Sequence, residues 1–154
     1  MFRITAKRLR LLLAMVLALS LFIIPVSAKF TTISVFIRGQ ELVSEPMVRR
    51  IDDLTYVPLR AFVTALDENA QFSWSDESQS AIVTSNGMDI KVKQDGSYIV
   101  ANGRYLYLDG GKVRNEDGSL MLPIRPLAKA FGVSVEWDSE QDCVLVSGTV
   151  TPTT

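Results

Sequence analysis

The chain contains no histidine and a single cysteine, Cys143, among its 154 residues. Without histidine it cannot build a Ser-His-Asp or Cys-His catalytic centre, or a metal site with imidazole ligands. With one cysteine it cannot form an internal disulfide, and the apolar, strand-like run around Cys143 favours a buried thiol over a reactive one. The residues present therefore predict no catalytic centre, no metal ion and no cofactor.

Basic residues are concentrated at the start of the chain. Four of them precede an apolar run over residues 11–24, and small residues follow at positions 26–28, which is the order of a signal peptide. The run is shorter than the roughly 20 residues that span a bilayer. We expect residues 1–28 to be a signal peptide, cleaved after Ala28, and the protein to be secreted or associated with the cell wall, without stable membrane insertion. An uncleaved membrane anchor is the alternative.

The 126 residues after Ala28 carry 12 basic and 17 acidic side chains, a net charge of −5. This charge provides no basic stripe for a phosphate backbone, so nucleic acid is not an expected partner. The length suits one domain and is too short for two ordinary ones. We place that domain at residues 29–148, followed by a polar tail at 149–154.

The domain is predicted to contain two copies of one unit, residues 33–94 and 97–148. The stretch "LTYVPLRAFVTAL" (54–66) aligns with "SLMLPIRPLAKAF" (119–131), and the spacing between copies is 63 to 65 residues. Self-similarity at a fixed period indicates a duplicated structural unit. The clearest matched positions are Gly39 and Gly103, Pro58 and Pro123, Arg60 and Arg125, and Trp74 and Trp137.

Each copy has the pattern of a β-hairpin, a short helix and further strands. Asn102-Gly103 is the strongest hairpin signal, because both central residues of a type I′ turn have positive φ. Pro58 and Pro123 suit the first turn of a helix, and Gly132 suits the left-handed position that ends one. Apolar side chains follow at helical spacing: Leu59, Phe62, Val63 and Leu66 in the first copy, and Ile124, Leu127, Ala128 and Phe131 in the second.

This pattern predicts an α+β fold. We expect a mostly antiparallel twisted sheet packed on two short helices, built from two related β-hairpin–helix–strand units. Helices of about nine residues are not stable alone, so their apolar stripes must dock on the sheet.

The segments "NGRYLYLDG" and "LPIRPLAKAFGVSVEWD" together resemble the copper amine oxidase N-terminal-like domain, the stalk domain of many secreted proteins of Gram-positive bacteria. The resemblance covers residues 33 to 148. It departs where residues 67–69 replace the usual glycine after the first helix, and where "GKVRNEDG" replaces a loop that often contains proline. The resemblance implies an accessory domain without the copper and quinone of the catalytic domain, and the absence of histidine excludes the three-histidine copper site.

Two pairs of matched side chains are candidate sites, and both have a structural and a functional interpretation. Arg60 and Arg125 are expected in the first helical turn, where a nearby carboxylate could clamp them, or where they could capture an acidic ligand. Trp74 and Trp137 are expected to close the core against their helices, although exposed indoles could instead stack on sugar rings. We favour the structural role for both pairs.

Tyr105 and Tyr107 form the best candidate for a ligand-binding patch. They share one face of a strand, with Leu106 and Leu108 on the other. Tyr98 is expected across the hairpin from them. Partly buried cross-strand tyrosines are also common without any binding role.

The sequence therefore favours a secreted, non-enzymatic binding or scaffolding module. Its expected partner is a cell-wall polymer, a polysaccharide or another secreted protein. One alternative is an inhibitor or regulatory partner of another secreted protein. The other is a small hydrolase that uses Asp76 with Glu77, or Glu136 with Asp138, although these pairs fall in polar turns.

Overall fold

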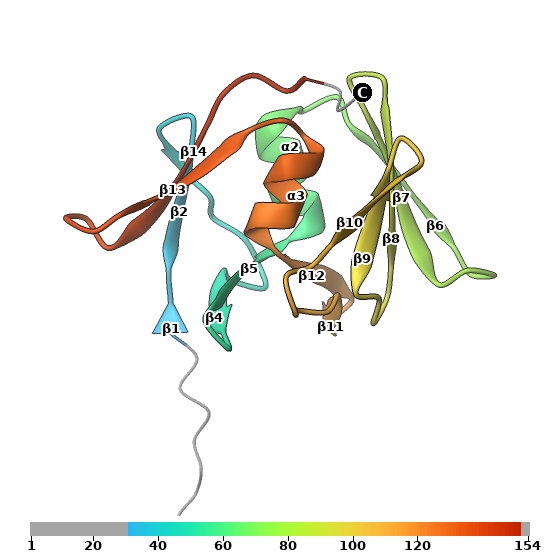
Figure 1. Ribbon diagram of the computed structural model, residues 1–154, viewed down its shortest axis with the longest axis horizontal. Helices are drawn as coiled ribbons and strands as arrows, with labels where there is room; N and C mark the ends of the chain where they lie inside the picture. The colour runs from blue at the N-terminus through green and yellow to red at the C-terminus, as the bar shows by residue number, and fades with distance from the viewer. Residues whose placement is uncertain (1–30, 152–154) are drawn as a thin grey trace, which may run out of the picture.

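The computed structural model describes residues 31–151 and is mainly β, with 49% of residues in strands and 12% in helices (Figure 1). Its strands form three sheets, and its two described helices are short: eight residues in α2 (Leu59–Leu66) and seven in α3 (Ile124–Ala130). The predicted α+β fold was therefore wrong. Frequent tight turns, most with residues at positive φ, divide the chain into many short strands and leave little of it for helices.

One five-stranded sheet forms the floor beneath the helices, in the order β1-β4-β5-β12-β11 (Figure 1). Its inner strands β5 (Leu54–Pro58) and β12 (Ser119–Pro123) are antiparallel and place Leu122 opposite Val57. Each of these strands runs directly into a helix, so their pairing brings the starts of α2 and α3 close together. The other strands are β1 (Thr31–Thr32), β4 (Arg49–Ile51) and β11 (Arg114–Glu116).

Two further sheets flank the helices, with the orders β13-β14-β2-β3 and β10-β9-β8-β7-β6 (Figure 1). Strands β14 and β2 pair in parallel, with Val144 opposite Val35, and the antiparallel pair β8–β9 completes the other sheet. Each sheet joins strands from both predicted copies, so the copies interlock. The bounds are β2 (Ser34–Ile37), β3 (Gln40–Glu41), β6 (Gln71–Ser75), β7 (Ser80–Ser85), β8 (Met88–Lys93), β9 (Tyr98–Ala101), β10 (Arg104–Tyr107), β13 (Ser134–Asp138) and β14 (Cys143–Ser147).

The core lies between the two helices and the three sheets. Phe62 of α2 meets Phe131 edge to face, with ring centroids 6.4 Å apart, and both side chains are fully buried. Burying a side chain of this size contributes about 1.5–3 kcal/mol. The apolar stripes predicted for both helices are buried as expected: Leu59, Phe62, Val63, Leu66, Ile124, Leu127, Ala128 and Phe131.

The ends of the helices follow the sequence closely. Pro58 and Pro123 are the N-cap residues, so each helix begins one position later than predicted. Gly132 has φ = +68° and follows α3 as expected, with its N–H donating to Lys129 and that of Val133 donating to Ala128.

The predictions for the ends of the chain fall largely outside the described residues. The signal peptide at 1–28 and residues 152–154 of the tail are not described. Thr151 donates its N–H to the carbonyl of Phe131 at 3.1 Å, so the described start of the tail lies against the end of α3. No helix within residues 31–151 combines the length and apolarity needed to cross a membrane.

Candidate binding site

Three tyrosines form an exposed cluster on the β9–β10 hairpin. Tyr107 lies opposite Tyr98 in the antiparallel register, and Asn102-Gly103 make the turn with φ of +47° and +79°. The Tyr98 ring centroid lies 5.0 Å from that of Tyr105 and 6.1 Å from that of Tyr107, with edge-to-face geometry. The intervening leucine of β10 is buried, so the predicted division of the strand into an aromatic face and a core face is confirmed.

The cluster leaves two of its rings open to solvent. Tyr105 is 61% exposed and Tyr107 is 71% exposed, whereas Tyr98 is half-buried beneath them. Two exposed aromatic rings on one face of a strand, each packed edge to face on a third, present apolar ring faces with hydroxyl groups at their edges. Such a surface can stack on a planar or ring-shaped ligand and donate or accept hydrogen bonds around it.

Trp74 and Trp137 are exposed, and the prediction that they close the core was wrong. Their exposed fractions are 45% and 42%. The hairpins that carry them project sideways past the helices (Figure 1). A helix of seven or eight residues is only about 10–12 Å long, so it cannot cover the full length of these strands. Each indole therefore borders an open groove instead of filling the core.

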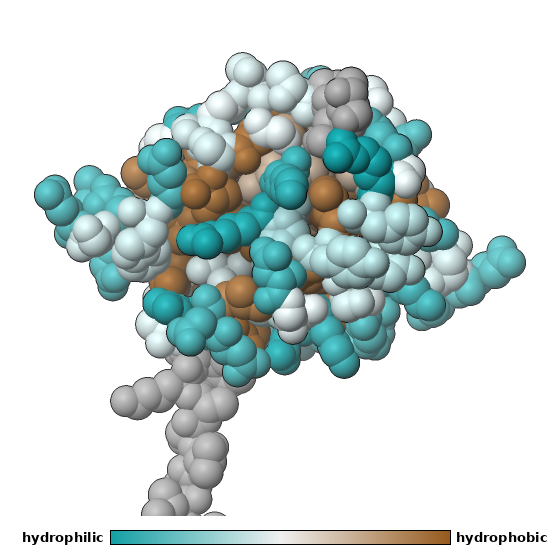
Figure 2. Space-filling model, viewed as in Figure 1, coloured by the Kyte–Doolittle hydropathy of each residue, from teal (hydrophilic) through white to brown (hydrophobic). Residues whose placement is uncertain are grey.

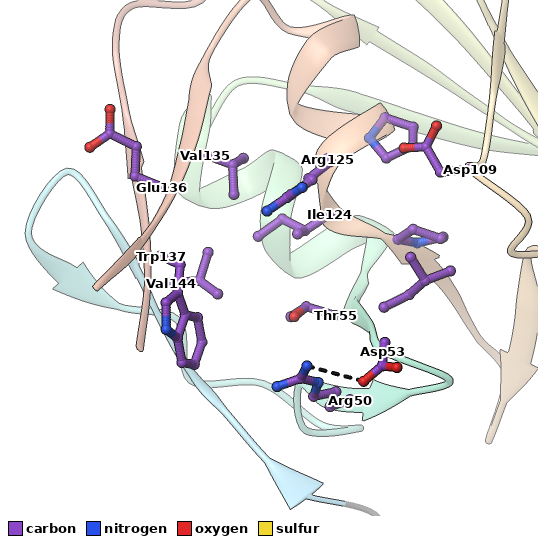
Figure 3. A pocket seen from close by; sticks show the side chains of 13 residues that line it. Arg50, Asp53, Thr55, Asp109, Ile124, Arg125, Val135, Glu136, Trp137 and Val144 are labelled. Atoms are coloured by element: carbon purple, nitrogen blue, oxygen red, sulfur yellow. Dashed lines mark hydrogen bonds and ion pairs between the residues drawn. The ribbon is translucent and has the colours of Figure 1, made fainter. Parts of the chain in front are cut away.

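A groove of about 490 Å³ lies between α3, the β13–β14 hairpin and the β4–β5 turn, and we call it the α3 groove (Figure 3). Trp137 lies along one side of it, and the Arg125 side chain points across it toward Val135. Arg50 and Asp53 form an ion pair of 3.1 Å at its far end. The groove thus combines an aromatic wall with charged groups.

The predicted carboxylate clamps on Arg60 and Arg125 do not form among the described residues. The Arg60 guanidinium carbon instead lies 4.3 Å from the centroid of the Phe72 ring. Arg125 is exposed and has neither a hydrogen bond nor an ion pair within residues 31–151. The sequence suggests carboxylates of the turns at Asp52-Asp53, Asp76 and Asp138 as partners, but Asp53 instead pairs with Arg50 of its own hairpin. Arg125 is therefore available to a ligand.

A shallow pocket of about 330 Å³ joins the tyrosine cluster to the α3 groove. Tyr105 and Tyr107 line this pocket, while Asp109, Arg125 and Pro126 line both the pocket and the groove. The two hollows therefore adjoin at these three residues, around the start of α3. We call this surface the aromatic track and define it by Tyr98, Tyr105, Tyr107, Asp109, Arg125, Pro126 and Trp137.

The molecular face that carries α3 is mixed in polarity. Figure 2 shows apolar side chains gathered around α3 and the sheet of β13, β14 and β2, interrupted by hydrophilic side chains. In the α3 groove the charges are also mixed, because Asp53, Asp109 and Glu136 line it together with Arg50 and Arg125. A ligand that fits this surface needs both apolar faces and polar substituents.

A second groove, of about 670 Å³, lies between α2, the β6–β7 hairpin and the β11–β12 turn, and we call it the α2 groove. Trp74 and Arg60 line it in the way that Trp137 and Arg125 line the α3 groove. The Trp74 indole N–H donates to Asp76 Oδ1 at 2.9 Å, which fixes the ring at the edge of the groove.

Two of the four carboxylates considered for a hydrolase have local structural roles. Asp76 accepts the indole N–H of Trp74, and Asp138 Oδ1 accepts the backbone N–H of Glu140 at 2.9 Å and of Gln141 at 3.1 Å. These are turn-stabilising bonds of the kind aspartate often makes. The described geometry gives no support to a paired-carboxylate reaction at these turns.

The chain does not fit a copper ion. It has no histidine, and within residues 31–151 no three His, Cys, Asp or Glu side chains are grouped so as to hold a metal. Cys143 is buried, as expected, and its burial raises the pKa of the thiol, with the carboxylates of Asp138 and Asp142 adding to the shift. The thiol is therefore protonated at neutral pH.

Some residues of the site could not be found from local sequence patterns. Arg50 reaches the α3 groove from strand β4 and Asp109 reaches it from the turn after β10, and only the tertiary fold brings these two segments there. One available signal was the internal alignment, because it assigns an Arg and a Trp to the same two places in both copies. The grooves themselves were not predicted.

The comparisons with known proteins agree with the resemblance seen in the sequence. No curated protein matches the chain. The family model of the copper amine oxidase N-terminal domain matches residues 36–146, which is most of the chain and nearly all of its described part. This domain is an accessory domain of that family and not its catalytic domain. The chain therefore belongs to the copper amine oxidase N-terminal domain family.

Proposed function

We propose that the protein is a secreted, non-catalytic module that binds cell-wall polysaccharide along the aromatic track. The observation that carries this proposal is the continuity of the track, from the exposed Tyr105 and Tyr107, past Arg125, to Trp137. An accessory domain of this family has no catalytic centre to contribute, so a surface built for binding is the function that its geometry supports best.

The chemistry of the track suits a sugar chain. A pyranose ring has an apolar face that stacks on an aromatic ring and hydroxyl groups around its edge that require hydrogen-bond partners. Tyr105, Tyr107 and Trp137 supply aromatic faces at the two ends of the track, and the Arg125 guanidinium supplies several donors between them. An acidic substituent on the polymer would pair with this guanidinium in bidentate geometry.

The composition of the chain supports the proposed location. A basic segment, a short apolar run and a small-residue cleavage motif precede the domain, and a secreted module meets the cell wall on its way out. The net charge of −5 after this segment disfavours adsorption to anionic polymers through charge alone. Retention on such a polymer would therefore report the specific contacts of the track.

Co-sedimentation with purified, insoluble cell wall tests the proposal. The wild-type protein should pellet with the wall. Tyr105→Ala/Tyr107→Ala and Trp137→Ala should each reduce the bound fraction, because each removes an aromatic face of the track. We expect up to about a tenfold weaker affinity for Trp137→Ala, which loses one aromatic contact of about 0.5–1.5 kcal/mol, and a larger loss for the double variant, which removes two rings.

Val43→Ala is the matched control, because Val43 is 87% exposed and lines neither groove. It removes an exposed apolar side chain without touching the track, so its retention should equal that of the wild type. The proposal is overturned by wild-type protein that stays in the supernatant, or by aromatic variants that pellet as well as the control.

A further inference from the structure

We propose that the α2 groove is a second carbohydrate site, specific for neutral sugars that carry an acetamido group, so that one molecule holds two glycan segments. The inference extends the proposed function but stands on a different groove with its own lining residues. The α2 and α3 grooves share no lining residue, so occupation of one leaves the other free.

The helix side of the two grooves is built from the same residue types at matched positions. The spacing of 65 residues relates the start of α2 to the start of α3, and 63 residues relate the strands that follow. Both grooves contain the proline that precedes the helix, the arginine of its first turn and the exposed tryptophan. The matched pairs are Pro58 and Pro123, Arg60 and Arg125, and Trp74 and Trp137.

The opposite side of each groove is contributed by the other predicted copy. Asn115 and Ser119 of the β11–β12 hairpin line the α2 groove, at the positions matched by Arg50 and Leu54 of the β4–β5 hairpin in the α3 groove. Because the sheets join strands of both copies, the opposite wall of each groove is repeated as well as its helix.

The aromatic residues of the α2 groove are fixed before any ligand arrives. Trp74 is anchored by its 2.9 Å bond to Asp76 and remains 45% exposed. Arg60 lies over Phe72 at 4.3 Å and makes no ion pair within residues 31–151. A ring face and a guanidinium held in one orientation lose little conformational entropy when a ligand binds.

The polar lining of the α2 groove selects a neutral ligand. The uncharged polar residues that line this groove carry hydroxyl and amide groups: Ser44, Thr64, Ser73, Asn115 and Ser119. The Ser44 hydroxyl and the Asn115 amide also bond to the protein, and only Arg60 and Glu45 among the lining residues are charged. Hydroxyl and amide groups match the hydroxyls of a sugar, because both sides donate and accept. The α3 groove has five charged lining residues instead.

The acetamido group is the substituent that this groove accommodates best. Its carbonyl oxygen can accept a bond from the Arg60 guanidinium, and its methyl group can lie against the apolar side chains of Leu59, Phe72 and Leu120. The volume of about 670 Å³ lies inside the range of roughly 300–1,000 Å³ that is typical of small-molecule sites. A short oligosaccharide therefore fits the groove in size and chemistry.

The two tryptophans allow each groove to be tested separately, because the chain contains no others. In Trp137→Phe, fluorescence comes from Trp74 alone and reports the α2 groove. In Trp74→Phe, it comes from Trp137 and reports the α3 groove. Phenylalanine keeps an aromatic ring at the replaced position, so the fold should be retained, which circular dichroism checks.

Chitotetraose and cellotetraose are suitable probes, because they share a β-1,4-linked backbone and differ in the acetamido groups. Chitotetraose should change the emission of Trp74 in Trp137→Phe, and cellotetraose should do so at least tenfold more weakly. Adding Arg60→Gln should weaken chitotetraose binding by about tenfold, as expected for a lost bond to a charged donor. Adding Tyr105→Ala/Tyr107→Ala should leave this titration unchanged.

The outcomes separate the two proposals. If the fluorescence of Trp74 does not change, or changes equally with both sugars, the inference about the α2 groove is overturned. Retention on cell wall through the aromatic track then still decides the proposed function. If Trp74 responds to chitotetraose but the wild type is not retained on cell wall, the α2 site stands and the proposed function fails. Self-association that disappears in Trp74→Ala would also overturn the inference, because the groove would then bind a second copy of the chain.

Discussion

The two grooves of the molecule share a frame and differ in their chemistry. In both, a proline leads into a helix, an arginine stands in its first turn and a tryptophan borders the opening. The β9–β10 hairpin beside the α3 groove carries Tyr98 and Tyr105, whose rings meet edge to face. At the matched positions of the β2–β3 hairpin, Ser34 donates a hydrogen bond of 2.8 Å to Glu41.

This difference helps to distinguish residues that build the fold from residues that are available to bind a ligand. Residues repeated in both halves, such as the helix-starting prolines and the buried stripes, build the shared fold. Residues that occur in one half only, such as the tyrosines, are free to specify a ligand. The arginines and tryptophans are repeated and yet exposed, so the fold does not require them for its core. For these four residues, repetition indicates two related surfaces.

If the two halves share one core, truncating Phe131 to alanine should lower the free energy of unfolding of the whole domain more than any other change considered. Phe131 is fully buried and contacts Phe62 of the other helix, so its truncation should cost about 3–5 kcal/mol. Leu66→Ala, at the matched position of the first half, should cost about 2–5 kcal/mol. Urea unfolding followed by circular dichroism gives both values.

The same experiment shows whether the halves unfold together. Trp74→Phe and Trp137→Phe each leave one reporter, in a different flanking sheet, and these reporters should unfold at the same urea concentration in the background of either core variant. Separate midpoints, with only one sheet affected by Phe131→Ala, would show that the halves have independent cores.

The helix ends provide a second, smaller difference between the halves. Gly132 ends α3 with φ = +68°, and a Cβ at this position would collide with Thr151, whereas Asp67 follows α2 and forms a 2.7 Å bond with the hydroxyl of Ser85. Gly132→Ala should cost about 1–2 kcal/mol for the left-handed backbone. It should cost about 1 kcal/mol more because the bond from Thr151 to Phe131 must break.

Gly103→Ala is the control for the backbone effect. Gly103 has φ = +79°, and a Cβ there would meet no atom within 4 Å, so only the cost of the left-handed conformation applies. The midpoint temperature of thermal unfolding should be lower for Gly132→Ala than for Gly103→Ala. Equal losses would mean that the contact between the tail and α3 contributes nothing to stability.

Much of the local structure could be predicted from the sequence. The helical stripes follow from spacing, and the tyrosine face of β10 follows from strand alternation, because both depend only on neighbouring residues. The turn at Asn102-Gly103 follows from its need for positive φ. Each of these features is determined within about ten residues of chain.

Most of the predictions that were wrong or incomplete depend on contacts between segments that are distant in the sequence. The α+β fold class was wrong because tight turns divide most of the chain into short strands and leave little of it for helices. The pairings between the two copies, including the parallel pair β14–β2, were also not predicted, because no local pattern specifies them. The prediction that Trp74 and Trp137 are buried was wrong, because their burial depends on how far each hairpin extends beyond a short helix. The aromatic track was only partly found, because Arg125 and Trp137 meet the tyrosines only in the folded chain.

The smallest expected effect concerns the first residue of the second strand in each tryptophan-bearing hairpin, where Cys143 of β14 matches Ser80 of β7. Ser80 is fully buried, and its hydroxyl donates to the carbonyl of Ser78 at 2.9 Å. Cys143→Ser should therefore be tolerated at neutral pH, with a loss below about 1.5 kcal/mol, because a hydroxyl at this position can make the corresponding bond to Gln141.

The stabilities of the wild type and of Cys143→Ser should differ at alkaline pH. The pKa of the Cys143 thiol is raised above its ordinary value of 9.0 in the folded chain, so above about pH 9 the unfolded chain loses this proton while the folded chain keeps it. Wild-type stability should then fall as pH rises, by more than that of Cys143→Ser, which lacks the titrating thiol. Urea midpoints of both proteins at pH 7 and pH 10 measure this difference, since the two proteins differ at this one residue. Identical declines would contradict this, because they would show that the thiol ionises as easily in the folded chain as in the unfolded chain.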